Sequence, residues 1–447
     1  MNRLLIDHVR IINEGQTFDG AVVIEGEKIS EVLRSREKPR AACDTVIDGS
    51  GACLMPGVID DHVHFRDPGL THKADMVSES RAAAAGGVTS FMDMPNTNPQ
   101  TTTLETLENK FRDAALKSRV NYSFYFGATN NNAPLLKELD KNQVCGVKLF
   151  MGSSTGNMLV DRMEALRTIF REAGMIIVAH CEDQSVISEN TRRYKALYGD
   201  DPDVRFHPEI RDTEACYRSS SLAVRLAEET GARLHIAHVS TARELELFSS
   251  APMEQKAITA EACVAHLYFT QDDYATLGTR IKCNPAIKSA ADRDALRRAL
   301  TDGRIDVIAT DHAPHLLKEK EGGALKAVSG MPMLQFSLVT MLEMADAGIL
   351  RPEDVVEKMC HAPARLFAIE GRGYIRPGYQ ADLVLVRPNS PWTVDSNTIL
   401  SKCGWSPLEG HTFQWRVERT FVNGRQVYNH GQIDDDCRGQ ALRFQRN

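Results

Sequence analysis

The spacing of hydrophobic positions changes twice along the chain, and each change marks a different kind of structure. Over residues 1–55, apolar runs such as LLIDHVRII and GAVVIEGEKISEVL predict short β-strands, with a turn at Glu25-Gly26-Glu27. From Val58 onward, short apolar runs alternate with amphipathic helical stretches, which is typical of a parallel sheet built from βα units. After about Ala368 the β pattern returns, with a hairpin turn at Asn423-Gly424.

Eight apolar runs occur in the central region, separated by segments with helical periodicity. Eight βα units over about 300 residues match the size of a TIM-type barrel. We therefore predict an α/β fold with a TIM-type (β/α)8 barrel over residues 56–366 and a β-sandwich domain built from both termini, residues 1–55 and 367–447. The active site of such a barrel lies where the strands end. The eight runs are PGVIDDHVHF, VTSFMDMP, NYSFYFGA, VCGVKLF, MIIVAHC, RLHIAHV, KAITAEA and IDVIATDHA.

Composition narrows the class of protein. The 447 residues carry a formal net charge of -7 with acidic and basic residues interspersed, so the chain lacks the basic footprint of a nucleic-acid-binding protein. No apolar run approaches the roughly 20 residues of a membrane span, and the start MNRLLIDHVRIINEG lacks the apolar stretch of a signal peptide. The ten cysteines form no C-x-x-C pair, which favours reduced thiols. We expect a cytoplasmic protein without nucleic-acid or membrane partners.

Side chains able to bind a metal follow several of the predicted barrel strands. His62 and His64 are two positions apart on the first strand and therefore face the same way. Taken alone, this pair is as compatible with ordinary surface or core histidines as with metal ligands. However, His180, His238 and Asp311 each end a later strand. Four strands thus deliver nitrogen and oxygen ligands to one rim, which predicts a metal site there.

Lys148 lies in a fifth predicted strand, within the apolar run GVKLFM. A buried ammonium group is costly unless it is paired or chemically modified. The ordinary alternative is a lysine whose stem is buried and whose ammonium group reaches solvent or a carboxylate. The residues alone leave both interpretations open.

Seven motifs along the chain match a known family, namely HVHFRDPG, MPNT, VKLFM, AHCED, HVS, CNP and TDHAPH. Over its whole length the sequence resembles the amidohydrolase superfamily, and within it the dihydroorotases, which stand beside hydantoinases and allantoinases. The resemblance implies a metal-dependent hydrolase of cyclic amides. The leading expectation is the reversible hydrolysis of (S)-dihydroorotate to N-carbamoyl-L-aspartate in pyrimidine (UMP) synthesis. We also expect a small-molecule substrate and a homo-oligomer, a dimer.

The resemblance implies two metal ions per subunit. Mixed imidazole and carboxylate ligands suit zinc, although manganese or cobalt could take its place. In the family the lysine of the fourth strand is carboxylated, which would turn Lys148 into an anionic bridge between the ions. Asp311 would also take the proton of the attacking water and pass it to the ring nitrogen. One ion would bind His62, His64 and Asp311 and the other His180 and His238, with carboxylated Lys148 and a hydroxide bridging them.

The family varies at this bridge. Some bacterial dihydroorotases use an aspartate in the loop after the fourth strand in place of the lysine. Here that loop reads MGSSTGNMLVD and carries no nearby carboxylate. Lys148 therefore fits the lysine-using pattern.

The resemblance also implies a set of substrate-binding residues. In dihydroorotases the arginine of HVH-x-R, the asparagine of MPNT and the second histidine of DHAPH bind the substrate carboxylate, and here they are Arg66, Asn96 and His315. Asn284 in KCNPAIK resembles a further contact to the pyrimidine ring. A guanidinium suits this task because it donates two parallel hydrogen bonds to a carboxylate. Allantoinases and hydantoinases typically lack the arginine and change the MPNT and DHAPH segments.

Each of these residues also has a structural alternative. Arg66 could pair with Asp67 or Asp75, Asn96 could close a turn, and His315 could cap its loop. The joint presence of all three favours substrate binding over three separate structural roles. The enzyme alternatives are an allantoinase or a hydantoinase (dihydropyrimidinase) on the same scaffold.

Two further questions concern a polar loop and a non-catalytic role. Residues 316–330 are charged and glycine-bearing, and they predict either a mobile lid or an ordinary surface loop.

A dihydroorotase-like subunit without activity would instead bind a partner enzyme, such as the carbamoyltransferase of the same pathway. Such subunits lose metal ligands, and this chain retains all six expected ones, which argues against that role.

Overall fold

The centre of the computed structural model, which describes residues 3–152 and 158–446, is a barrel of eight parallel strands. The strands follow one another around the barrel in chain order. A bridge between Val63 and His312 brings the first and last strands together and nearly closes the ring. This confirms the predicted barrel: seven of the eight apolar runs contain a whole strand, and KAITAEA contains all of its strand except the last residue. The strands are β6 (Val58–Val63), β7 (Val88–Asp93), β8 (Asn121–Gly127), β9 (Gly146–Phe150), β10 (Ile177–His180), β11 (Leu234–Ile236), β12 (Ile258–Cys263) and β13 (Val307–Ala309).

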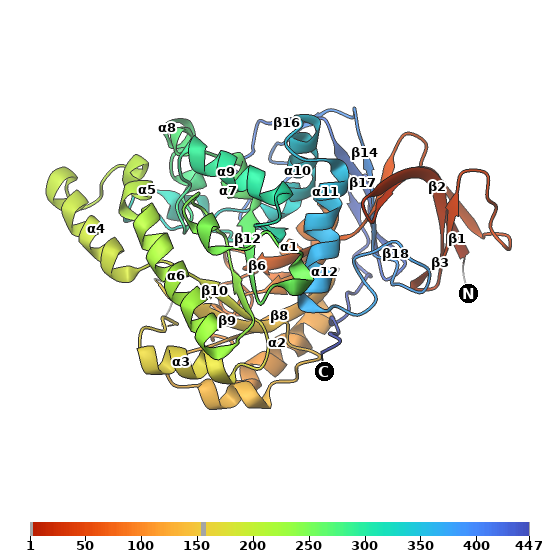
Figure 1. The fold of residues 1–447 in the computed structure, drawn as a ribbon. Coiled ribbons are helices and arrows are strands. Elements are labelled where there is room, and N and C mark those ends of the chain that lie inside the picture. Colours follow the sequence, from red (N-terminus) through yellow and green to blue (C-terminus); the bar gives the residue numbers. More distant parts are fainter. Residues whose placement is uncertain (1–2, 153–157, 447) are drawn as a thin grey trace.

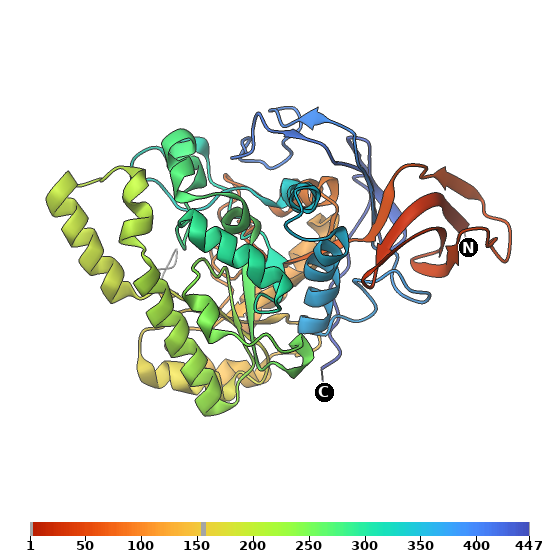
Figure 2. The same ribbon diagram turned by 45° about the horizontal axis from the view of Figure 1, so that its top comes forward.

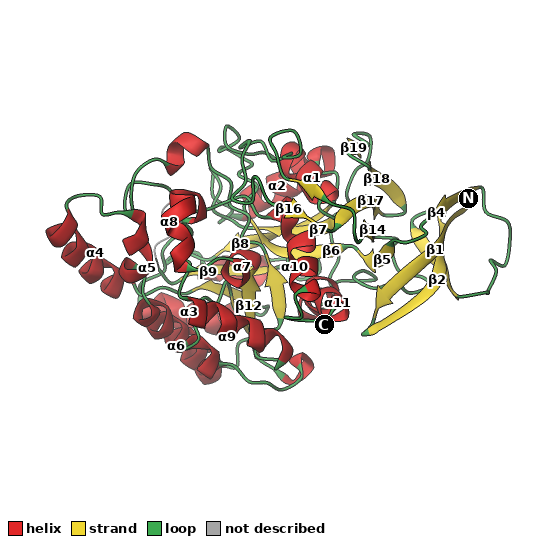
Figure 3. Cartoon of the chain, turned by 90° about the horizontal axis from the view of Figure 1, so that it is seen from above, coloured by secondary structure: helices red, strands yellow, loops and turns green. Residues whose placement is uncertain are grey.

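Helices surround these strands (Figure 3). Side-chain caps fix where several helices begin, because Asp75 accepts a hydrogen bond from the Ser78 amide and Asp212 accepts one from the Ala215 amide. Among the described residues, no helix combines the length and apolar character needed to cross a bilayer. The helices are α1 (Met76–Ala85), α2 (Leu104–Lys117), α3 (Met163–Glu172), α4 (Gln184–Tyr198), α5 (His207–Ile210), α6 (Thr213–Thr230), α7 (Val264–Tyr268), α8 (Tyr274–Leu277), α9 (Ala290–Thr301), α10 (Ser337–Asp346), α11 (Pro352–Val356) and α12 (Ala362–Phe367).

Strands from both ends of the chain form a second, nine-stranded sheet beside the barrel, as predicted. The N-terminal strands (red) and C-terminal strands (blue) lie side by side in Figures 1 and 2, and β5 pairs with both β1 and β14. The predicted hairpin turn at Asn423-Gly424 joins β17 to β18, with positive φ angles of 50° and 75°. The domain boundaries near residues 55 and 366 stay predictions. The strands are β1 (Arg3–Asn13), β2 (Gln16–Glu25), β3 (Lys28–Arg34), β4 (Thr45–Asp48), β5 (Cys53–Pro56), β14 (Leu383–Arg387), β17 (Arg416–Val422), β18 (Arg425–Asn429) and β19 (Gln432–Ile433), with β15 (Trp392–Thr393) and β16 (Thr412–Phe413) pairing separately.

The last residues of the chain cover the end of the barrel at which the strands begin. Ala441 forms a bridge with Tyr122 at the start of β8. Leu442 and Phe444 are buried in one apolar cluster with Tyr125 and Val178 from inside the barrel. This packing seals the barrel floor with the tail, and the opposite rim is left for the site.

Because Phe444 is almost fully buried in this cluster, Phe444→Ala should destabilise the protein. Truncating a buried phenylalanine to alanine typically costs about 3 to 5 kcal/mol, since it loses apolar burial and leaves a cavity. Urea-induced unfolding followed by fluorescence would measure the change. Leu116→Ala is the matched control, since Leu116 is 71% exposed on α2 and its loss should cost little. Equal unfolding midpoints for the two variants would contradict the sealing role.

Candidate active site

The carboxyl ends of the barrel strands bring all six predicted metal ligands to one cavity. β6 carries His62 and leads into His64, β9 carries Lys148, and β10 ends at His180. His238 and Asp311 each lie two residues beyond a strand, after β11 and β13. The cavity is lined by His62, His64, Arg66, Asn96, Lys148, Phe150, His180, His238, Asn284, Asp311, Ala313, Ser329 and Gly330.

The first ligand group is His62, His64 and Asp311. The Oδ1 atom of Asp311 lies 3.1 Å from His64 Nε2 and 3.4 Å from His62 Nε2. The other nitrogen of each ring meets an acceptor, because His62 Nδ1 is 2.9 Å from Glu261 Oε1 and His64 Nδ1 is 2.7 Å from Asn96 Oδ1. With Nδ1 protonated, both Nε2 lone pairs face a carboxylate oxygen. A cation between these atoms would satisfy all three of them.

Electrostatics at this group agree with a neutral His64 and an ionised carboxylate. Burial lowers the pKa of His64 to about 4. Burial alone would raise the pKa of Asp311, but positive charge at the positions of His62 and His64 holds it well below its ordinary value, and a cation bound between neutral rings would supply that charge. Asp311 is therefore an anion at neutral pH, as a metal ligand must be.

The second ligand group is His180 and His238, whose Nδ1 and Nε2 atoms are 2.9 Å apart. His180 Nε2 also lies 2.9 Å from Glu182 Oε2, and Arg211 binds both oxygens of Glu182 at 3.0 and 2.6 Å. Burial lowers the pKa of both imidazoles. Two neutral rings that point nitrogens at one another form a second place where a cation fits.

Lys148 is buried in the lining of the same cavity. It is 1% exposed, and within the described part of the chain its Nζ atom has no hydrogen-bond partner. Burial lowers the pKa of Lys148, although Glu261 and Asp311 oppose the shift. An unpaired buried amine beside metal-type ligands fits a group that becomes a ligand itself. Residues 153–157 of the loop after β9, which sequence analysis found to lack a nearby carboxylate, lie outside the described residues.

Arg66 presents its guanidinium group to the same cavity. Its Nε atom donates to the Pro314 carbonyl at 3.1 Å, and its Nη2 atom lies 2.9 Å from His315 Nε2. The structural alternatives for Arg66 are occupied, because Lys117 pairs with Asp67 and Lys402 pairs with Asp75. Arg66 is thus held at the cavity wall without a carboxylate partner among the residues that the structure describes.

The remaining predicted substrate residues occupy different positions around Arg66. Asn96 and Asn284 line the cavity, and the buried Oδ1 atom of Asn284 has no hydrogen-bond partner among the described residues. His315 does not line the cavity; it lies behind Arg66, with its Nδ1 atom 3.1 Å from Lys73 Nζ. His315 therefore contacts the guanidinium group of Arg66, and Arg66 in turn lines the cavity.

Sequence analysis missed the residues that orient the ligands. Glu261 contacts His62 Nδ1 and accepts a hydrogen bond from the backbone amide of His238 at 2.8 Å. For Glu261, the sequence signal was a charged residue inside the apolar run KAITAEA. For Glu182, the signal was a carboxylate two residues after His180, because a carboxylate at a buried strand end needs a partner.

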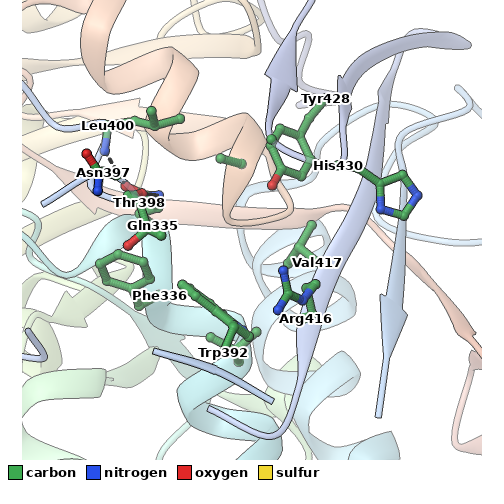
Figure 4. A pocket seen from close by; sticks show the side chains of 13 residues that line it. Gln335, Phe336, Trp392, Asn397, Thr398, Leu400, Arg416, Val417, Tyr428 and His430 are labelled. Atoms are coloured by element: carbon green, nitrogen blue, oxygen red, sulfur yellow. Dashed lines mark hydrogen bonds between the residues drawn. The ribbon is translucent and has the colours of Figure 1, made fainter. Parts of the chain in front are cut away.

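A second groove lies between α10, the segment after β15, and β17 and β18 (Figure 4). It has a volume of about 220 Å³, and Phe336, Trp392 and Tyr428 are among its lining residues. The convergent groups of His, Cys, Asp and Glu side chains that the described residues form all lie elsewhere, in the barrel. The groove therefore lacks the chemistry of the cavity at the rim.

Known proteins resemble this chain over almost its whole length. The model of the Amidohydrolase family matches residues 53–427. A dihydroorotase from Halobacterium salinarum is 34% identical over 94% of this chain and 97% of its own, and an allantoinase from Bacillus velezensis is 30% identical over 96% and 94%. Among solved structures, L-hydantoinase (dihydropyrimidinase) from Arthrobacter aurescens superposes with a TM-score of 0.93 at 28% identity, covering 99% of this chain and 100% of the other.

These relatives share a fold with this chain, and their names all denote hydrolases of cyclic amides. The cavity at the barrel rim supplies the imidazole, carboxylate and buried amine groups that this chemistry uses. The family match covers well over half of the sequence. The chain therefore belongs to the amidohydrolase family and is a cyclic amidohydrolase.

Proposed function

We propose that this chain is a dihydroorotase, which reversibly hydrolyses (S)-dihydroorotate to N-carbamoyl-L-aspartate in pyrimidine (UMP) synthesis. The observation that carries the proposal is the guanidinium of Arg66 in the cavity beside the metal-type ligands. Dihydroorotate bears a carboxylate next to its cyclic amide, and a buried guanidinium pairs with such a group through two hydrogen bonds. The 34% identical dihydroorotase relative supports the same substrate. On the basis of the sequence, we also propose that the protein is cytoplasmic and forms a homodimer.

The described residues fit two zinc ions. His62, His64 and Asp311 would hold one ion, and His180 and His238 the other. The unpaired Nζ of Lys148 fits a bridge: its neutral amine would add to CO2, forming an N–C bond and releasing a proton, to give an anionic carbamate. Zinc bound there would lower the pKa of water and polarise the scissile carbonyl.

The residues around the cavity then divide the remaining work. Asp311, which is ionised, accepts the proton of the attacking water and passes it to the ring nitrogen as the C–N bond breaks. Arg66 and Asn96 hold the substrate carboxylate, and Asn284 contacts the ring. His315 supports Arg66 from behind.

The alternatives within the family are an allantoinase or a hydantoinase. The 30% identical allantoinase and the structural likeness to L-hydantoinase support these alternatives. Uncharged cyclic amides, however, offer no anion to Arg66. A comparison of charged and uncharged substrates therefore separates these activities.

Lys148→Ala should lose at least one of the two metal ions and most of the activity, because no other side chain on β9 is placed to bridge them. Lys148→Arg is the matched control, since it keeps a cation but cannot take up CO2. We expect both variants to be inactive, and short carboxylic acids to restore part of the activity of Lys148→Ala alone. Metal analysis and a dihydroorotate assay measure the two effects. Full metal content and activity in Lys148→Ala would remove the bridging role.

Arg66→Met should weaken the binding of dihydroorotate far more than that of dihydrouracil, which lacks the carboxylate. Losing one partner of a buried charged pair costs about 2 to 5 kcal/mol. The ratio of kcat/KM for the two substrates, in the wild type and the variant, gives the measurement. Equal losses on both substrates would make Arg66 a structural residue and count against a dihydroorotase.

Asp311→Asn should reduce turnover by roughly 100- to 10,000-fold, the range for a lost general acid or base. The amide oxygen can still bind metal, but it cannot accept the proton of water. In the wild type, hydrolysis should rise with pH because it needs a deprotonated water, and ring closure should fall because it consumes a proton. The pH profile of kcat in both directions, with metal content checked in each sample, tests this. A fully metallated Asp311→Asn enzyme with wild-type turnover would leave Asp311 a ligand only.

A further inference from the structure

One buried side chain ties down residues 316–330, the segment for which sequence predicted either a lid or a surface loop. Lys320 is 2% exposed, and its Nζ atom donates to the carbonyl oxygens of Lys282, Val328 and Gly330 at 3.0, 2.7 and 2.7 Å. An ammonium group has three N–H donors and no acceptor. All three donors are therefore used within the protein, in the arrangement that makes a buried ammonium tolerable.

These three bonds join two segments that line the active-site cavity. Lys282 lies two residues before Asn284, and Gly330 follows Ser329; Asn284, Ser329 and Gly330 all line the cavity. The Gly330 amide also donates to the Lys282 carbonyl at 2.8 Å. Lys320 thus binds both of the segments that form this part of the cavity wall.

The backbone at Gly330 packs closely against the residues next to it. Its φ angle is +131°, and a Cβ atom there would lie 2.6 Å from the Ala313 carbonyl oxygen and 3.0 Å from His315. The backbone of Gly330 therefore forms the cavity surface next to His315, the residue that contacts Arg66. A shift of this segment would change the shape of the cavity on the side of Arg66.

We propose that Lys320 is a positioning residue for substrate binding, whose ammonium group clamps the Asn284 segment to the Ser329–Gly330 segment and so fixes this wall of the cavity. Lys320 does not line the cavity, so it acts through the wall and not by touching the substrate. The inference rests on the proposed function only in taking a cyclic amide as the occupant of the cavity.

Lys282 reinforces the clamp from the other segment. Its Nζ atom donates to the Ala327 carbonyl. Both lysines thus bind carbonyl groups of residues 327–330.

Hydrogen exchange tests the clamp without reference to any substrate. Lys320→Met should speed up exchange in residues 321–331 relative to the wild type at the same pH, because the three bonds to carbonyl oxygens are lost. Lys326→Met is the matched control, because Lys326 is an exposed lysine of the same segment, and it should behave like the wild type. Wild-type exchange in Lys320→Met would overturn the proposal. If that variant does not fold, Lys320→Gln, which keeps two N–H donors but no charge, takes its place with the same two outcomes.

Steady-state kinetics then separate positioning from chemistry. Because the loss concerns the fit of the substrate, Lys320→Met should raise the KM for dihydroorotate by about tenfold or more at pH 6, with kcat changed by less than about twofold. A lowered kcat with unchanged KM would overturn the positioning role. If dihydroorotate proves not to be a substrate, the exchange result still decides the clamp, and the proposed function alone fails.

Discussion

Lone pairs that face one another in a buried rim are the constraint on which the rest of this structure depends. His62 and His64 direct nitrogens at Asp311, and His180 and His238 direct nitrogens at each other. Such groups repel one another unless a cation or a proton lies between them, and burial lowers the pKa values of His64, His180 and His238. Parallel strands in a closed barrel hold the groups in place because each strand end is fixed by two neighbours. The fold therefore holds in place a set of groups between which a cation would fit, and which a flexible scaffold would let collapse.

The orientation of these ligands is shared among strands. Glu261 on β12 contacts His62 from β6 and accepts from the amide of His238 after β11. Glu182, paired with Arg211 and two residues after His180, lies beside His180 at the end of the same strand. A carboxylate behind an imidazole fixes its tautomer and keeps the inner nitrogen free to bind a metal. Removing Glu261 would therefore disturb predicted ligands that come from two other strands.

Sequence patterns predict the parts of this molecule that depend on local order. The eight strands are visible because parallel strands are buried on both faces, and the ligands are visible because they end those strands. The contact from His62 to Glu261 spans 199 residues, and no periodicity encodes it. The sequence predicts residues 316–330 only as a polar loop, because it does not distinguish a lysine that is bound to three carbonyl groups from a lysine that is exposed to solvent. For the same reason, His315 could be placed near Arg66 but not behind it.

The proposed preference for an anionic substrate rests on the charges around Arg66. His315 lies 2.9 Å from Arg66 and 3.1 Å from Lys73, and burial together with these cations lowers its pKa far below the ordinary value. A neutral imidazole offers one lone pair, so the two cations compete for it. Lys73 has a carboxylate partner in Glu319 at 2.8 Å, whereas the other contact of Arg66 is the Pro314 carbonyl. The guanidinium is therefore the group left short of acceptors, and it lines the cavity. Under the proposed function, a carboxylate on the substrate would supply the missing acceptor, which a neutral ring would not.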